Sequence, residues 1–198
     1  ADVLPRAPLG PVPQRGTEEF ALLFQTSVHG IGLVGHCELC FDGRTLTYGA
    51  YDPVHQRLLR TAGAGIVFSA PREPYLRWCI GTHHRRVISY SLRLPPAQAA
   101  QLRAELERFR QTLSPWQPEA LPEDWDPGRL RRLGGVRFWR VQRGPYATYF
   151  IPTINCVSLT NELLEKTDIG RTVMLGLKTP GAYLDLLERE NLAGNPAV

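Results

Sequence analysis

The sequence has no run approaching about 18 consecutive apolar residues, so it predicts no membrane-spanning helix. The segment ADVLPRAPLGPVPQRG, at positions 1–16, also lacks the basic and then apolar order of a secretory signal. We therefore expect either that the chain is not sent through the general export route, or that a signal was removed before its first residue.

Lysine is scarce, because only Lys166 and Lys178 contribute to the 23 basic residues and arginine supplies the rest. The formal net charge is +4, which permits a weak attraction to anionic polymers. However, the arginine clusters at 85–86 and 129–132 are short and are not interleaved with aromatic residues as in nucleic-acid-binding proteins. We interpret them as a solvated basic face and expect no nucleic-acid partner.

Cysteine is scarce too, and the four cysteines are too few for a disulfide framework in a chain of 198 residues. Cys37 and Cys40 form a C-x-x-C pair, but no second pair and no H-x3-5-H segment completes a zinc site. On a strand these two side chains point to opposite faces, so chelation is not expected. We expect no metal and no organic cofactor, and we leave open a disulfide that includes Cys79.

Hydrophobic residues make up 43% of the sequence and aromatic residues 9%, values that are ordinary for a globular protein. We predict one domain over residues 19–198. It is preceded by an extended arm over residues 1–18, which has prolines at 5, 8, 11 and 13 and no periodicity.

Alternating or continuous apolar patterns predict several strands, and Asp42-Gly43 is a strong hairpin turn signal between two of them. We interpret 53–72 as mostly loop and 75–79 as a short helix or strand. The predicted strands are 18–27, 28–41, 45–52, 87–94, 136–142 and 146–152.

Three helices are predicted, over 95–113, 155–170 and 179–190. The first begins with two prolines and carries an apolar stripe at positions 102, 106, 109 and 113. Gly170 is expected to end the second. The order of strands, helix, strands, helix and helix favours an α+β fold over a doubly wound parallel sheet.

Cys156 is the candidate nucleophile. The preceding Asn155 is a good N-cap residue, which places Cys156 in the first turn of its helix. Unpaired backbone N–H groups and the helix dipole there favour an anion, so we expect a lowered thiol pKa and a place for an oxyanion. The alternative is a small thiol buried in the core.

His36 is the candidate base, because it follows a glycine at the start of the apolar strand CELCF and its ring leaves a rigid element. His29, which is flanked by Gly30, is the second choice. His55, His83 and His84 lie in loop or turn segments.

Four short motifs carry a family resemblance: GHCEL at 35–39, LTYGAYDP at 46–53, NCVSLTNELL at 155–164 and TPGAYLDLL at 179–187. Together they resemble the permuted branch of the NlpC-type papain-like superfamily, in which the strands that bear the histidine precede the helix that bears the cysteine. The resemblance covers roughly residues 20 to 190. It implies a papain-like fold, circularly permuted, with an antiparallel sheet packed against helices.

The resemblance also implies roles, with Cys156 as nucleophile, His36 as general base and a third polar group that orients the imidazole. In a two-residue hairpin Phe41 pairs with Arg44, which puts Thr47 and Tyr51 on the face of His36, whereas a one-residue bulge would reverse this. Tyr51 is therefore our first choice, although the family more often has His, Asp, Asn or Glu there. Candidates for substrate binding are Tyr48, Asp52 and Asn155.

By this resemblance we expect a cysteine peptidase or amidase that forms an acyl-enzyme on peptidoglycan peptides. We expect such a protein to act in the bacterial periplasm or after secretion. A secreted antibacterial effector would have an immunity or secretion partner. The first alternative is an acyltransferase or thioesterase on lipid acyl groups, with an apolar groove formed by 58–68 and 146–151. The second is a non-catalytic binding module on the same fold, signalled by an unreactive Cys156.

Overall fold

A computed structural model of the chain describes residues 19–26, 35–57, 61–82, 84–117, 126–167 and 178–193. The predicted arm over 1–18 lies outside these residues. So do His29, His83, most of the predicted strand before His36 and the predicted helix end at Gly170.

The core of the fold is a seven-stranded sheet in which every pair of neighbouring strands is antiparallel. A short two-stranded sheet of β4 (Ala62–Ala64) and β9 (Thr148–Phe150) lies apart from it. In spatial order the seven strands are β6 (Arg86–Arg93), β1 (Glu19–Thr26), β2 (His36–Phe41), β3 (Arg44–Gly49), β5 (Ile66–Pro71), β8 (Arg137–Val141) and β7 (Leu113–Pro115).

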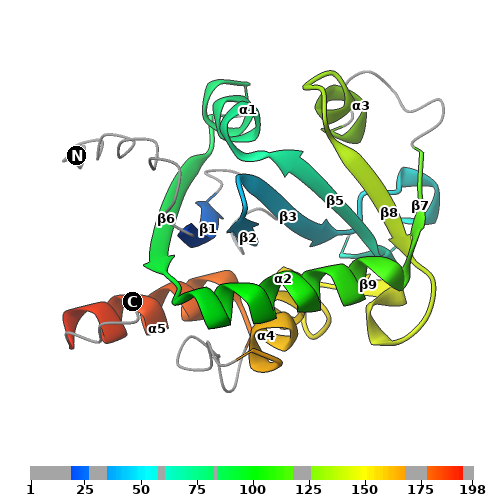
Figure 1. Ribbon diagram of the computed structural model, residues 1–198. Coiled ribbons are helices and arrows are strands. Elements are labelled where there is room, and N and C mark those ends of the chain that lie inside the picture. The colour runs from blue at the N-terminus through cyan, green and yellow to red at the C-terminus, as the bar shows by residue number, and fades with distance from the viewer. Residues whose placement is uncertain are drawn as a thin grey trace.

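Helices lie on both sides of this sheet, with α1 and α3 on one side and α2, α4 and α5 on the other (Figure 1). The fold is therefore mixed α+β with an antiparallel sheet, as predicted. The helices are α1 (Arg72–Arg77), which continues into a π-helical turn (Trp78–Thr82), α2 (Pro96–Gln111), α3 (Asp126–Arg131), α4 (Cys156–Glu165) and α5 (Pro180–Leu192), with 3-10 turns at Pro53–His55 and Pro145–Ala147.

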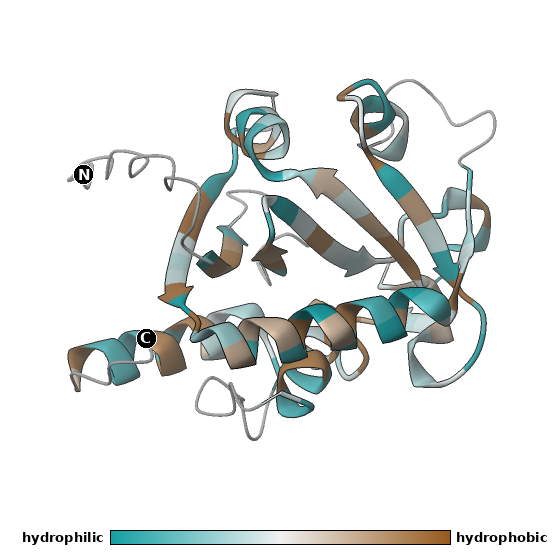
Figure 2. Cartoon of the chain, viewed as in Figure 1, coloured by the Kyte–Doolittle hydropathy of each residue, from teal (hydrophilic) through white to brown (hydrophobic). Residues whose placement is uncertain are grey.

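The alternation of side chains on β1 divides the core between the two faces. Phe20, Leu22 and Phe24 belong to the cluster that contains residues of α2, α4 and α5, and we call this side the long-helix face. Ala21 and Leu23 pack with residues that include Leu76 of α1, on the short-helix face. The continuous apolar run of β1 thus follows from its burial on both faces, and brown hydrophobic bands occur on strands across the sheet among teal and white ones (Figure 2).

The hairpin of β2 and β3 has the predicted turn. Asp42 and Gly43 have φ of 49° and 70°, both in the left-handed region that a type I′ turn requires. Phe41 pairs with Arg44, and Cys40 pairs with Thr45. The predicted register is therefore confirmed, and no bulge reverses the faces in this paired part.

The interpretation of 53–72 as mostly loop is wrong, because this segment contains β4 and the central strand β5. The sequence IVFSAP of β5 is apolar and almost entirely buried, but the glycines that precede it are typical of a loop. Gly65 has a packing role instead: a Cβ there would lie 2.0 Å from the carbonyl oxygen of Tyr146.

The helix predictions hold in part. Residues 75–79 belong to α1 and its π-helical turn, and α5 begins at Pro180 as expected. α4 ends at Glu165 rather than at Gly170, with Lys166 as its C-cap. The apolar stripe of α2 packs inward, although its last member, Leu113, lies in β7.

Candidate functional site

Asn155 fixes the start of α4, as predicted. Its side-chain oxygen accepts a hydrogen bond from the Ser158 backbone N–H at 3.0 Å, and the Ser158 hydroxyl oxygen accepts one from the Asn155 N–H at 2.8 Å. The Asn155 amide nitrogen also donates to the carbonyl oxygens of Ile151 and Lys178, each at 2.8 Å. This capping box makes Cys156 the first residue of the helix.

The Cys156 thiol lies against the backbone of β2. Its Sγ accepts a hydrogen bond from the Cys37 N–H at 3.4 Å. The residue pairs between β2 and β3 run only from Phe41–Arg44 to Leu39–Leu46, so Cys37 lies beyond the paired part of the hairpin. The first turn of α4 therefore provides the acceptor for that N–H group.

Burial dominates the acidity of this thiol. Cys156 is only 3% exposed, and the loss of solvation raises its pKa to about 11. Hydrogen bonds from the Cys37 and Val157 backbone N–H groups act in the opposite direction but are weaker. The expected lowering of the pKa is thus wrong for this structure, because a helix N-terminus favours a thiolate less than burial disfavours it.

The His36 ring is held through one nitrogen. Its Nε2 lies 2.5 Å from Oγ1 of Thr47 and 3.2 Å from the hydroxyl oxygen of Tyr51, and these two hydroxyls are 3.2 Å apart. Thr47 and Tyr51 therefore share the face of His36, as the hairpin register predicted. Within the described residues, Nδ1 of the ring has no hydrogen-bond partner.

A buried carboxyl that the sequence analysis missed lies beside this ring. Glu38 is fully buried, and its Oε1 lies 3.7 Å from His36 Nε2 and accepts a hydrogen bond from the Tyr75 hydroxyl. Gln25 donates to Tyr75 at 3.0 Å, and Arg85 donates to Gln25 at 2.8 Å. The available signal was a pair of polar residues, Gln25 and Glu38, in two strands that are mostly apolar.

The pKa values of His36 and Glu38 are both shifted in the direction that favours the neutral form of each group. Burial lowers the pKa of His36 to about 3, with a smaller contribution from the positive charge of Arg85. Burial also raises the pKa of Glu38 to about 7, although the hydrogen bond from Tyr75 partly offsets this. The imidazole is therefore neutral at pH 7, in the state that can accept a proton.

His36 and Cys156 approach each other through the backbone of β2 rather than by direct contact. Cys37 packs in the same cluster as Cys156 on the long-helix face, whereas the His36 ring bonds to residues of the short-helix face. Among the residues that the structure describes, no hydrogen bond joins the ring to the thiol. The structure thus places the thiol at the N–H group one residue after His36.

The predicted substrate-binding residues Tyr48 and Asp52 are both buried and make internal contacts. The Tyr48 hydroxyl donates to the carbonyl oxygen of Tyr146 at 2.9 Å. The Asp52 carboxylate accepts from the Val54 N–H at 3.1 Å, lies 2.7 Å from Nδ1 of His55 and forms an ion pair with Arg140. Their role in substrate binding stays a prediction, as does that of Asn155, whose polar atoms hold the helix start.

All four cysteines are buried and none forms a disulfide, so the bond left open for Cys79 does not form in this structure. Cys37 and Cys40 pack in clusters on opposite faces of the sheet, as predicted. Among the described residues, no three His, Cys, Asp or Glu side chains are grouped so as to hold a metal ion.

The chain matches no protein-family model, no curated protein and no solved structure. Within the part of the chain that the structure describes, no helix has both the length and the apolar character needed to cross a membrane.

Proposed function

We propose that the protein is a cysteine hydrolase that cleaves amide bonds through an acyl-enzyme on Cys156, with His36 as its base. The observation that carries this proposal is the hydrogen bond from Cys37 to the Cys156 thiol. It holds a thiol from a helix N-terminus beside the backbone of Cys37, the strand residue that directly follows His36. The resemblance of the sequence to permuted papain-like enzymes points to the same two residues.

The His36 imidazole is neutral at pH 7 and so has a nitrogen lone pair that can take a proton, but its pKa of about 3 makes it a weak base in this conformation. Because Thr47 and Tyr51 both contact Nε2 of His36, Nδ1 is the nitrogen left to take the thiol proton. In this structure the His36 ring lies on the short-helix face and the Cys156 thiol lies on the long-helix face, so the proposed dyad requires a rearrangement of the N-terminal end of β2 and not only a side-chain rotation. Tyr51 and Thr47 act as positioning residues that choose the tautomer and the ring orientation.

The reaction then follows two steps with balanced proton transfers. As the Cys156 sulfur attacks the amide carbonyl carbon, His36 takes the thiol proton and passes it to the leaving amine nitrogen, which gives a thioester. Water attacks the thioester while His36 takes one of its protons and returns it to the sulfur. Backbone N–H groups at the start of α4 stabilise the oxyanion in both steps.

Peptidoglycan peptides are the proposed substrate class, on the strength of the sequence resemblance. This substrate assigns the protein to the bacterial periplasm or to the outside of the cell. An immunity or secretion partner belongs to the same proposal.

A non-catalytic binding module is the second candidate, and one observation favours it. The Cys156 thiol is 3% exposed and its pKa is raised to about 11, which are the properties of an inert core thiol. In this case the hydrogen bond from Cys37 is only a packing contact that satisfies a backbone N–H group.

The two candidates are separated by incubating the protein with defined muropeptides and measuring cleavage products and protein-bound acyl groups by mass spectrometry. Cys156→Ala and His36→Gln test the two proposed groups. Cys40→Ala is the matched control, because Cys40 is about as buried as Cys156 and lies on β2, the strand that carries His36. We expect cleavage by wild type and Cys40→Ala, an acyl adduct on Cys156, and loss of both in the two site variants.

Cleavage that survives in Cys156→Ala would show that another group is the nucleophile. If no substrate is cleaved and iodoacetamide modifies Cys156 no faster than Cys40 in the native protein, the binding-module candidate is correct. Thermal unfolding of each variant confirms that lost activity does not reflect lost folding.

A further inference from the structure

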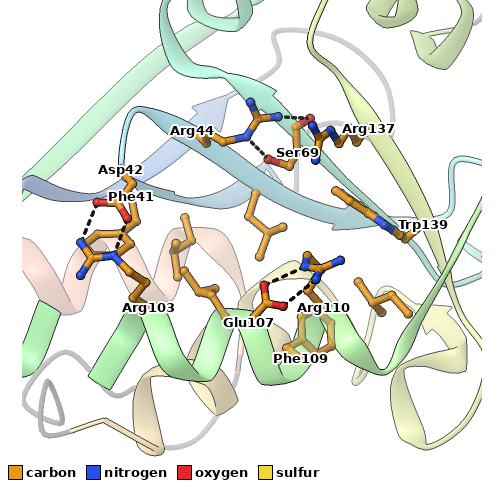
Figure 3. Close-up of a pocket in the computed structure, with 14 residues that line it drawn as sticks. Phe41, Asp42, Arg44, Ser69, Arg103, Glu107, Phe109, Arg110, Arg137 and Trp139 are labelled. Atoms are coloured by element: carbon orange, nitrogen blue, oxygen red, sulfur yellow. Dashed lines mark hydrogen bonds and ion pairs between the residues drawn. The ribbon is translucent and has the colours of Figure 1, made fainter. Parts of the chain in front are cut away.

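A groove separates the C-terminal half of α2 from the long-helix face of the sheet, and its residues belong to none of the proposed catalytic groups. It has a volume of about 380 Å³, which lies within the range of small-molecule sites. Figure 3 shows side chains from both walls entering it. Its lining is Leu39, Phe41, Asp42, Arg44, Leu46, Ser69, Arg103, Leu106, Glu107, Phe109, Arg110, Leu113, Arg137 and Trp139.

Much of this lining is apolar. Leu46 and Trp139 come from the sheet, and Leu106, Phe109 and Leu113 come from α2 and the strand that follows it. All five side chains are partly rather than fully buried. A ligand that covers them would gain the free energy of removing apolar surface from water.

Two of the four arginines in the groove are already neutralised. Arg103 forms a two-point ion pair with Asp42, with distances of 2.9 and 3.0 Å, and its guanidinium lies over the Phe41 ring. Arg110 forms a similar pair with Glu107 on the same helix, at 2.7 and 2.5 Å. These pairs use both carboxylates of the lining.

The other two arginines have no carboxylate partner in the described part of the chain. Arg44 donates only to neutral oxygens, namely the Ser69 hydroxyl at 2.8 Å and the carbonyls of Ser69 and Gly135 at 3.1 and 2.8 Å. The Arg137 side chain makes no hydrogen bond or ion pair with any described residue. Both project from the sheet wall, on either side of Ser69 (Figure 3).

The two guanidinium groups also repel each other. The pKa of Arg44 is lowered, first by its burial and then by the nearby charge of Arg137. Arg44 is nevertheless held in place by three hydrogen bonds, while the Ser69 hydroxyl that accepts one of them retains its own proton for donation. An anion bound between them would relieve this repulsion and receive charge-assisted hydrogen bonds.

We propose that this groove binds a small amphipathic anion, with a carboxylate or phosphate head between Arg44 and Arg137 and an apolar chain along Leu106, Phe109 and Trp139. The head group is inferred to be anionic and to lie between the two arginines, because the only unneutralised charges of the described lining lie at this end of the sheet wall. The rest of the ligand is inferred to be apolar, because the partly exposed side chains along the groove are apolar.

Isothermal titration calorimetry with decanoate, decyl phosphate and the neutral decanoyl glycerol tests this, each ligand kept below its aggregation threshold. Arg137→Gln is the main variant, because this side chain supports no described contact and its loss should leave the fold intact. Arg93→Gln is the matched control: it removes an equal charge from an exposed position on β6, at the opposite edge of the sheet. Arg137→Lys retains the charge.

We expect either anion to bind about tenfold or more tightly than the neutral ligand, and Arg137→Gln to lose about tenfold in affinity while Arg93→Gln binds like wild type. Shortening the chain from decanoate to octanoate should weaken binding by several-fold per methylene. The anion that binds more tightly identifies the head group. Equal binding of the neutral ligand, no binding of either anion, or an unchanged affinity in Arg137→Gln would overturn the proposal.

Discussion

The backbone N–H of Cys37 donates a hydrogen bond to Sγ of Cys156 at 3.4 Å, although the two residues are 119 positions apart. This contact ties the first turn of α4 to the first residues of β2. The hydrogen bond itself lowers the thiol pKa, but burial raises it by more, so the thiol is well placed and poorly acidic. The same packing that brings the sulfur to the strand removes it from water.

The hydroxyls of Tyr51 and Thr47 should control the orientation of the His36 ring. Tyr51→Phe removes one partner of Nε2, and we expect kcat on an amide substrate to fall about tenfold with little change in KM. The ring ¹⁵N chemical shifts of His36 should move as well, which reports the tautomer without any substrate. Tyr90→Phe, on the distant strand β6, is the control and should change neither readout; unchanged His36 shifts in Tyr51→Phe would contradict the assigned role.

The buried carboxyl of Glu38 should make stability depend on pH. Its pKa of about 7 in the folded protein exceeds the ordinary value of 4.5, so the folded state retains a proton that the unfolded chain releases between these values. This contribution to stability is present below pH 4.5 and is lost as the pH rises through about 7. The Glu38→Gln variant has no carboxyl group to ionise, so it does not lose this stability as the pH rises. Its side-chain oxygen can still accept the hydrogen bond from the Tyr75 hydroxyl.

Urea unfolding of Glu38→Gln and wild type at several pH values measures this effect. We expect the stability of the variant relative to wild type to increase between pH 4.5 and 8 by on the order of 3 kcal/mol. The opposite pH dependence that comes from the lowered pKa of His36 is present in both proteins and cancels in the difference. Glu73→Gln, at an exposed position on α1, should show no such trend. If the difference in unfolding free energy between Glu38→Gln and wild type does not change with pH, Glu38 is ionised in the folded protein and the assigned pKa is wrong.

Asn155 should determine both the stability of α4 and the burial of the Cys156 thiol. Asn155→Ala removes the N-cap and leaves two carbonyl oxygens without their donor, so we expect a loss of about 2 kcal/mol in unfolding free energy. Alkylation of Cys156 by iodoacetamide should become faster because the first turn is no longer fixed. Thr179→Ala removes the cap of α5 and should destabilise the fold by about 1 kcal/mol, with a smaller effect on the alkylation rate.

Gly65 should tolerate no side chain. A Cβ at this position would lie 2.0 Å from the backbone oxygen of Tyr146, and backbone cannot move aside as a flexible side chain would. We expect Gly65→Ala to lower the unfolding free energy by about 2 kcal/mol or more in chemical denaturation. Gly81→Ala is the control, because a Cβ at that position would have no described atom within 4 Å beyond its own neighbours; equal stability of the two variants would contradict this packing.

Local signals predicted much of the fold. The Asp42-Gly43 turn determined the register of β2 and β3, and through it the correct prediction that Tyr51 and Thr47 reach His36. Asn155 predicted the start of α4 in the same way, because capping involves groups that are close together in the sequence.

The failures concern properties that depend on distant parts of the chain. β5 escapes sequence-based prediction because its position between β3 and β8 is decided by long-range pairing rather than by its glycine-containing flanks. The predicted pKa of Cys156 is wrong because burial by the sheet cannot be read from a helix N-terminus. Glu38 gives little signal because its partners, Tyr75 and His36, come together only through the fold.

The two N–H donors of the Asn155 amide join three places in the chain: the turn after β9, the N-cap of α4 and the segment before α5. Asn155 is therefore a cross-link between these segments at the start of the helix that carries the Cys156 thiol. A shift of the backbone at either Ile151 or Lys178 would reach this one residue, so we expect both segments to influence how firmly the first turn of α4 is held.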